Sequence, residues 1–183
     1  MEFLIRDLEL PDISNLSKFK CGIESMDNYL VHEAYYNHIC GEGRTKVVVN
    51  EDNNSIIAYY TLKSDSVEVF DKDMHYNSRY IPCIEVSRLA VISEWQYGKK
   101  GINLGTSLLG QIITVVKEKI APKIGCHNIT LHALPDKVNW YEERDFVIGV
   151  DERKGEEDDT VYMYLNITDP EMLNEYVNYK KSG

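Results

Sequence analysis

Two hydrophobic periods alternate along the chain and predict interleaved strands and helices. Apolar residues that alternate or run together predict strands at 3–5, 45–50, 55–62, 81–92, 128–133, 146–150 and 160–166. Apolar residues that recur every three or four positions predict helices at 24–38 and 105–120. Helix-start residues predict a short helix at 11–16 and a terminal helix from 169 onward, and a further short helix is expected at 137–144. We expect residues 66–70 to continue or pair with the strand at 55–62, and Pro122 to end the helix at 105–120. This order predicts a mixed sheet with helices packed on it.

The length and composition predict one folded domain. A chain of 183 residues fits a single domain, and 43% hydrophobic with 27% charged residues is ordinary for a globular protein. We therefore expect one domain over 1–183, with a helical extension at 169–183. No apolar run approaches the ~20 residues of a membrane span, and the acidic start lacks the features of a signal peptide. These features favour a soluble, cytoplasmic protein without a membrane partner.

Charge and cysteine spacing exclude some function classes. The formal net charge of −10 weighs against broad nucleic-acid binding, although a local basic patch remains open. The four cysteines form no CxxC pair, which disfavours zinc ribbons and thioredoxin-type redox sites. His38 lies two residues before Cys40, but a metal site there would need more ligands, so we expect no metal. His127 and His132 flank or occupy a predicted strand, and we interpret both as structural.

A loop between the strand at 81–92 and the helix at 105–120 is the first candidate binding site. The loop contains two glycines and two lysines and leads to a helix N-terminus, whose unpaired amides attract phosphate. The alternative is a loop that only connects two elements.

Two segments here resemble the acetyl-CoA signature of the GNAT acetyltransferases. They are Arg-Leu-Ala-Val at 88–91 and the run at 100–109, matching a strand that ends in L-x-V and then R/Q-x-x-G-x-G/A at a helix start. Lys100, Asn103 and Gly105 take the three defined positions, although Asn103 replaces a glycine and the loop at 92–99 is longer than usual. The resemblance implies acetyl-CoA as co-substrate, bound by Leu89, Ala90, Val91, Lys99, Lys100, Gly101, Ile102, Asn103, Leu104, Gly105, Thr106 and Ala133.

A second match follows the strand at 128–133. Residues 140–146, Trp-Tyr-Glu-Glu-Arg-Asp-Phe, resemble the FYEKxGF segment of the same family. The resemblance places Tyr141 near the CoA sulfur, where its hydroxyl can donate to the departing thiolate. Asp145 stands where the family has glycine, which puts the turn in question. The alternative for Tyr141 is a core-packing role.

A third match near the N-terminus narrows the resemblance to one GNAT subgroup. Phe-Lys-Cys-Gly at 19–22, Asp-Asn-Tyr-Leu at 27–30 and Ala-Tyr-Tyr-Thr-Leu at 58–62 resemble segments of the subgroup that includes bacterial toxins acetylating aminoacyl-tRNA. The fold implied is α/β (α+β): a GNAT fold with a mixed, mostly antiparallel twisted sheet of six to seven strands. Helices would cover both faces, and the central strands would splay at the acetyl-CoA site.

Acetyl transfer to an amine needs a neutral nucleophile, and a base helps because a lysine-like amine is mostly protonated at pH 7. Glu85 is the candidate base, on the strand before the loop and expected in phase with Ser87, Leu89 and Val91. The alternative is a solvated or ion-paired carboxylate. A backbone N–H near 89–91 would stabilise the developing oxyanion.

We therefore expect an acetyl-CoA-dependent N-acetyltransferase whose acceptor is a primary amine, led by the amino group of aminoacyl-tRNA. A small or peptidyl cationic amine is the second candidate, to which the acids at 156–159 could contribute. A catalytically silent acyl-CoA-binding module is the third. A homodimer and an antitoxin protein stay open as partners. If a set of N-terminal cations clusters beside the CoA sulfur, an RNA acceptor is favoured; these are Lys18, Lys20, Arg44 and Lys46.

Overall fold

Seven strands form one twisted sheet in the computed structural model, which describes residues 2–70, 78–150 and 159–182. The sheet order is β1-β2-β3-β4-β5-β7-β6. The strands are β1 (Phe3–Asp7), β2 (Arg44–Asn50), β3 (Ser55–Phe70), β4 (Ser78–Val91), β5 (Asn128–Ala133), β6 (Val147–Ile148) and β7 (Val161–Asn166). Neighbours pair antiparallel except β4 and β5, which run parallel. The mixed, mostly antiparallel sheet of six to seven strands is confirmed.

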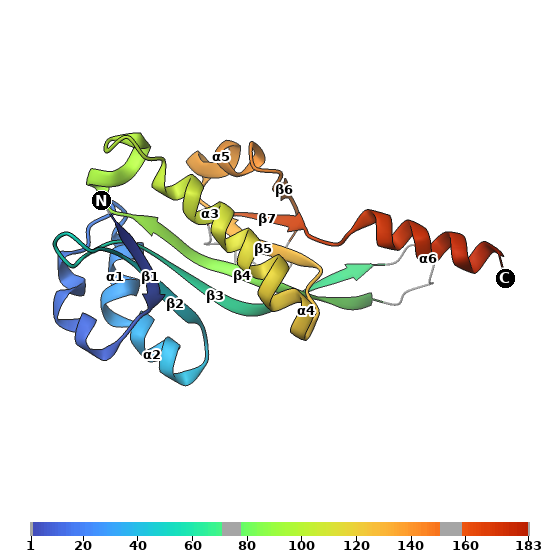
Figure 1. Ribbon diagram of the computed structural model, residues 1–183, viewed down its shortest axis with the longest axis horizontal. Coiled ribbons are helices and arrows are strands. Elements are labelled where there is room, and N and C mark those ends of the chain that lie inside the picture. The colour runs from blue at the N-terminus through green and yellow to red at the C-terminus, as the bar shows by residue number, and fades with distance from the viewer. Residues whose placement is uncertain (1, 71–77, 151–158, 183) are drawn as a thin grey trace.

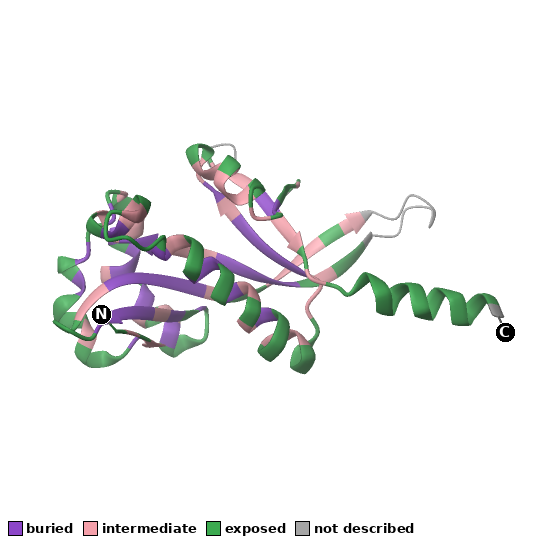
Figure 2. Ribbon diagram, turned by 45° about the horizontal axis from the view of Figure 1, so that its top comes forward, coloured by how far each residue is buried: buried purple, intermediate pink, exposed green. Residues whose placement is uncertain are grey.

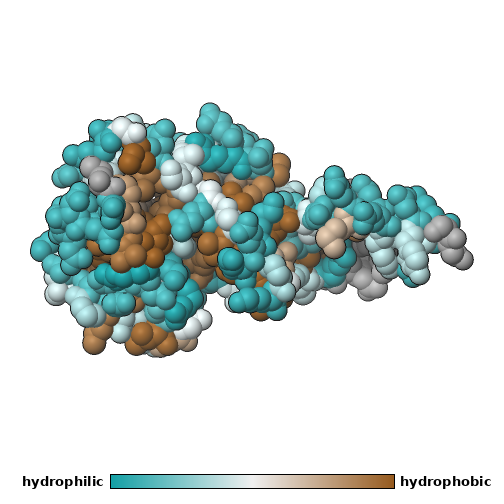
Figure 3. All heavy atoms as spheres, in the orientation of Figure 1, coloured by the Kyte–Doolittle hydropathy of each residue, from teal (hydrophilic) through white to brown (hydrophobic). Residues whose placement is uncertain are grey.

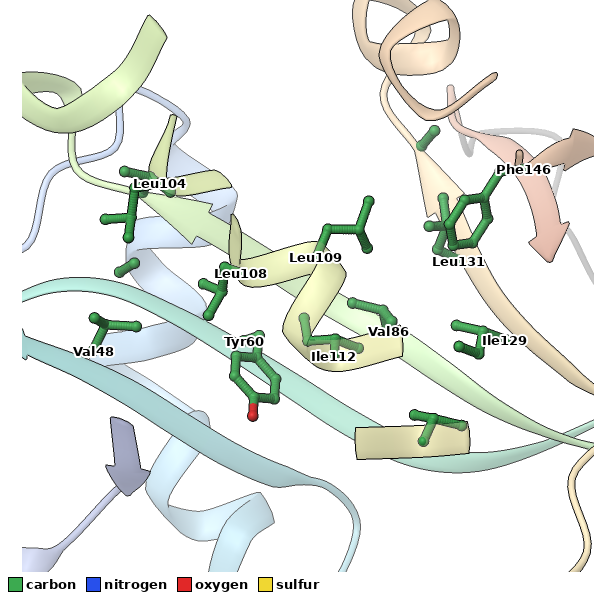
Figure 4. Close-up of a cluster of buried hydrophobic side chains, with 14 of the residues drawn as sticks. Val48, Tyr60, Val86, Leu104, Leu108, Leu109, Ile112, Ile129, Leu131 and Phe146 are labelled. Atoms are coloured by element: carbon green, nitrogen blue, oxygen red, sulfur yellow. The ribbon is translucent and has the colours of Figure 1, made fainter. Parts of the chain in front are cut away.

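Helices cover both faces of the sheet, as expected (Figure 1). On one face lie the 3₁₀ helix η1 (Leu10–Lys18), α1 (Glu24–His32) and α2 (Ala34–Cys40), packed on Val47, Val49 and Tyr59. On the other face lies α3 (Leu104–Val115), whose apolar side chains pack against those of β3, β4 and β5 (Figure 4). Odd and even positions of β2 therefore enter two different cores, which explains its continuous valine run.

Short helices fill the connections around α3. They are η2 (Ser93–Gly98), the π-helical turn η3 (Val116–Ile120), α4 (Ala121–Ile124), η4 (Pro135–Lys137) and α5 (Val138–Glu142). Each predicted strand is present, although β4 starts three residues earlier than expected and β6 is only two residues long.

Two predicted helix boundaries are wrong. The helix expected over 24–38 is broken at Glu33, where φ is −120° and ψ is −36°. The spacing of the buried positions Asp27, Leu30, Ala34 and His38 runs through this break unchanged, so the sequence pattern did not reveal it. Pro122 does not end the helix after α3, because the π-turn η3 widens the backbone just before it. Proline cannot donate the usual i→i−4 bond, and a π-turn is one way to accommodate that.

The expected phase of β4 is also wrong. The pairing of β3 with β4 shifts register between Thr61 and Leu62, which leaves Ser87 as an extra residue on β4. Val86 and Leu89 consequently both face α3, whereas Glu85 and Arg88 face the opposite side. Glu85 is therefore not in phase with Leu89 and Val91.

The last helix, α6 (Pro170–Ser182), projects from the end of the sheet (Figures 1 and 2). Its residues are exposed throughout the part whose side chains are described, including Met172, Leu173 and Tyr176. Within the described chain, no helix combines the length and apolarity needed to cross a membrane.

Candidate functional site

The candidate site is a cleft where β4 and β5 part. Their parallel pairing has three rungs, ending at Glu85 and Thr130. Beyond that rung the strands diverge, and a cavity of about 780 Å³ opens between Val86–Val91 on one side and Leu131–Leu134 on the other. The splay expected of the central strands is therefore present.

The cleft passes through the sheet. Its lining includes Cys21, Ile23 and Met26 from the side of α1, and Asn103–Thr106 from the side of α3. Apolar surface is exposed beside α3 along the middle of the face in Figure 3. A ligand that enters at the start of α3 can thus reach groups on the opposite face.

The start of α3 offers backbone donors to the cleft. The first intrahelical bond runs from Ser107 N–H to the Asn103 carbonyl, so the amides of Leu104, Gly105 and Thr106 have no partner within the helix. A Cβ on Gly105 would lie 3.9 Å from both Trp140 and Val91, two side chains that line the cleft. The missing side chain keeps space open in front of these amides, which suits an approaching phosphate. Asn103 has φ of −82° and needs no left-handed backbone, so its departure from glycine causes no strain.

The long loop at 92–99 and the N-terminal signature hold each other in place. Ser93 N–H donates to the Lys20 carbonyl at 3.0 Å, and the Gln96 side-chain amide donates to the Cys21 carbonyl at 2.7 Å. The Cys21 N–H in turn donates to the buried Asp27 carboxylate at 2.9 Å. The extra residues of this loop, together with residues 19–22, therefore form the wall of the cleft on the side of α1.

Tyr141 lines the cleft, and its position near the CoA sulfur stays a prediction. Its ring packs edge-on against Trp140 and Phe146, with centroids 4.8 and 5.6 Å away. Burial raises the pKa of the phenol to about 12, so the hydroxyl stays protonated at neutral pH. Asp145 adopts φ of +66°, the left-handed conformation that glycine usually supplies, and the turn that buries Phe146 is kept.

Glu85 does not line the cleft; it lies below the point where the strands part. It is 8% exposed, 3.1 Å from Lys63 Nζ and 3.9 Å from His132 Nδ1. Burial disfavours the carboxylate, but the contacts with His132 and Lys63 outweigh this and lower the pKa of Glu85. His132 does line the cleft, although sequence reasoning assigned it a structural role.

The cleft is locally basic in an acidic protein. Among its described lining residues there is one acid, Asp136, against four basic residues: Arg88, Lys99, Lys137 and Arg144. Arg144 stacks on Trp140 at 4.2 Å and donates to the Thr106 hydroxyl at 3.0 Å, beside the start of α3.

The N-terminal cations singled out by sequence lie outside this lining. Arg44 and Lys46 both pair with Asp7, at 3.5 and 3.0 Å, and Lys20 lies 3.9 Å from Asp27. The acids at 156–158 lie outside the described residues, so their relation to the cleft stays a prediction. No group of three or more metal-ligating side chains occurs among the residues that the structure describes.

Most of the residues expected to hold acetyl-CoA meet at this cleft. Those that line it are Leu89, Ala90, Val91, Lys99, Asn103, Leu104, Gly105, Thr106 and Ala133. Lys100, Gly101 and Ile102 are not part of the lining. Sequence reasoning did not single out Lys137, Trp140 or His132 as site residues. The available signal was that His132 adjoins Ala133, Trp140 adjoins Tyr141, and Lys137 lies between these two pairs.

Several proteins that are similar to this chain in sequence or structure are toxins. A tRNA-acetylating toxin of Mycobacterium tuberculosis (strain ATCC 25618 / H37Rv) is 29% identical over 143 residues, covering 76% of this chain and 82% of the toxin. A variant of the toxin AtaT, bound to the C-terminus of the antitoxin AtaR and to acetyl-CoA, superposes with a TM-score of 0.69 at 20% identity, covering 91% of this chain and 94% of AtaT. AtaT complexed with acetyl-methionyl-tRNAfMet gives 0.68 at 22% identity, covering 88% and 94%.

The chain has the fold of the GNAT toxins. The resemblance read from the three motifs is thereby confirmed, although no family model matches the sequence. In this GNAT fold the cleft between β4 and β5, the start of α3 and Tyr141 come together at one site.

Proposed function

We propose that the protein is an acetyl-CoA-dependent N-acetyltransferase that acetylates the amino group of an aminoacyl-tRNA. The observation that carries the proposal is the cleft itself, which joins the free amides of α3 on one face of the sheet to Tyr141 and the α1 side of the sheet. The amides would hold the pyrophosphate of acetyl-CoA, and the pantetheine arm would run between β4 and β5. The bound thioester would then lie within the sheet.

The chemistry needs one bond made and one broken. The acceptor nitrogen attacks the thioester carbonyl, a backbone N–H near 89–91 stabilises the oxyanion, and the C–S bond then breaks. Tyr141 is protonated and can donate to the departing thiolate. These steps need no metal.

The charge of the cleft supports the tRNA acceptor over a cationic small amine. Four basic side chains against one acid would repel a cationic acceptor and attract phosphate. The net charge of −10 does not oppose this, because ionic contacts act over about one Debye length of ~8–10 Å. The Mycobacterium relative is a tRNA-acetylating toxin, which supports the same acceptor.

We propose three further features of the protein: one GNAT domain over 1–183 with a helical extension at 169–183, a cytoplasmic location, and an antitoxin protein as partner. The antitoxin is supported by AtaT, a variant of which is bound to the C-terminus of the antitoxin AtaR. A homodimer stays open.

The test is acetyl transfer by the purified protein. Titration calorimetry should detect acetyl-CoA binding, and a thiol-release assay should show turnover with aminoacyl-tRNA but not with uncharged tRNA. Turnover should fall steeply as salt rises. If thiol is released only with polyamines or peptides, the acceptor is a cationic small or peptidyl amine instead of aminoacyl-tRNA. Binding of acetyl-CoA without release with any amine would support the silent module.

A further inference from the structure

A charged cluster of Glu85, Lys63 and His132 lies at the base of the cleft and has no part in the proposed chemistry; Glu85 is buried, and the other two side chains are partly exposed. Glu85 ends the paired part of β4 and faces away from α3, as does Lys63 opposite it on β3. On β5, Leu131 and Ala133 enter the core under α3, so Thr130 and His132 face the same side as Glu85. One face of three strands therefore holds a linked set of charges that ends at the cleft.

His132 is the member of this set that lines the cleft. It lies two residues beyond the last rung of β4 with β5, where the strands have already parted. Its ring contacts Tyr162 of β7 with centroids 5.4 Å apart, and Glu85 lies on its Nδ1 side at 3.9 Å. The imidazole is thus held from two directions by neighbouring strands, and its side chain remains 25% exposed.

The acceptor amine should arrive on this face. The start of α3 occupies the other side of the sheet, where the pyrophosphate would be held. The side of α1 carries Arg88 on β4 and His132 on β5, one on each wall of the cleft. An amine that approaches the thioester from there passes His132.

We propose, resting on the proposed acetyl transfer, that His132 accepts the proton from the acceptor amine and that Glu85 is the positioning residue that orients its imidazole. The neutral ring would take the proton as the nitrogen attacks, the new C–N bond would form, and the C–S bond would break with the electron pair going to sulfur. The proton would return to the CoA thiolate, directly or through Tyr141. Atoms and charge balance without a further reactant.

Energetics favour His132 over Glu85 for this step. The N–H of the amine becomes acidic as its nitrogen attacks the carbonyl, and an imidazole, with an ordinary pKa of ~6.5, can accept that proton at neutral pH. Glu85 is fully ionised at neutral pH and is a much weaker base, but its charge can stabilise the imidazolium that forms. Lys63, which opposes that effect, is already paired with Glu85. Other titratable groups on this face of the described strands are Cys83, Arg88, Tyr162, Tyr164 and Asp65, whose carboxylate accepts from Thr130.

The test compares His132→Gln with His127→Gln, a change at the residue just before β5 and outside the cleft lining, where the ring Nδ1 lies 3.0 Å from the Asn128 side-chain oxygen. Single-turnover acetylation of aminoacyl-tRNA is followed from pH 6 to 9, and acetyl-CoA affinity by calorimetry. We expect His132→Gln to be slower by ~10²- to 10⁴-fold at pH 7 with affinity unchanged. Its rate should keep rising with pH, because the amine must lose its proton unaided. His127→Gln should follow the wild type.

A second readout does not depend on activity. The pH at which the His132 ring titrates is measured by NMR in the wild type and in Glu85→Gln. Loss of the carboxylate should lower that midpoint by about one unit or more, because a nearby negative charge favours the imidazolium.

An unchanged midpoint in Glu85→Gln would overturn the positioning role. If the wild type acetylates its acceptor and a folded His132→Gln keeps its rate within about threefold across the pH range, His132 is not the base, whereas the proposed function stands. If the wild type itself acetylates no amine, it is the proposed function that fails.

Discussion

Replacing Tyr141 with phenylalanine isolates the contribution of one hydroxyl. The ring contacts with Trp140 and Phe146 remain, so the turn and the cleft should keep their shape. Only the donor to the departing thiolate is lost. The effect should therefore appear in turnover and leave acetyl-CoA affinity nearly unchanged.

The size of the effect follows from the pKa of the two groups. Burial raises the pKa of Tyr141 to about 12, whereas a free thiol titrates at ~8.5, so complete proton transfer to a solvated thiolate would be unfavourable. A hydrogen bond to a charged group still contributes ~1.5–3 kcal/mol, or about 10- to 150-fold in rate. Burial in the same cleft makes the thiolate more basic, so that it can take the proton from Tyr141 more fully. The loss in rate on removing the hydroxyl then approaches the ~10²- to 10⁴-fold typical of general acid catalysis. We expect a fall of about 10²-fold or more.

The assay is single-turnover transfer from acetyl-CoA to aminoacyl-tRNA, with calorimetry for affinity and thermal unfolding for stability. Tyr59→Phe is the matched control, because the Tyr59 hydroxyl donates to the Met26 carbonyl at 2.7 Å and its ring is fully buried away from the cleft lining. That change should lower stability by ~1 kcal/mol and spare turnover. If folded Tyr141→Phe loses less than about tenfold in rate with its true acceptor, the hydroxyl has no part in the chemistry.

Three further changes address the cofactor site, the acceptor and the last helix. Gly105→Val should weaken acetyl-CoA binding by about 10-fold or more in calorimetry, whereas Gly110→Val, in open space on the same helix, should not. If both variants bind acetyl-CoA equally well, the pyrophosphate does not lie at the start of α3. Lys137→Gln and Arg144→Gln should each weaken tRNA binding and reduce the slope of log affinity against log salt by about one, and unchanged slopes would remove them from the RNA contact. Removing residues 170–182 should leave the melting temperature unchanged within about 2 °C, since α6 is exposed; a large drop would mean that it packs on the domain.

The fold could be predicted from the sequence because alternation and helical spacing report directly on burial. The valines of β2 and the apolar stripe of α3 are all buried in the cores of the sheet. These buried elements fix the position of the backbone on which the motifs beside the cleft lie. The contribution of the α3 amides could be inferred as well. Backbone donors are available in any helix start that small residues leave open, so Asn103 in place of glycine does not remove them.

The side-chain chemistry was harder to predict because it depends on register. One extra residue at Ser87 reverses the phase of β4, so Glu85 shares a face with Arg88 rather than with Leu89. A period-2 pattern cannot reveal such a bulge when both faces of the strand carry apolar residues. The neighbourhood of His132 could not be predicted for a related reason: Glu85 lies 47 positions away in sequence, and only the parallel pairing of β4 with β5 brings the two side chains together.

The two sides of the cleft depend on different kinds of contact, and this difference decides how the preference for an acceptor could change. On the side of α3 the donors are backbone amides, which tolerate substitution as long as Gly105 stays small. On the side of α1 the wall exists because residues 19–22 dock onto the long loop through the Ser93 and Gln96 bonds. If the proposed function holds, a change in that N-terminal segment moves the α1 side of the cleft and leaves the α3 amides in place. Acceptor preference should therefore vary with the N-terminal signature, while the amides that would hold the pyrophosphate stay constant.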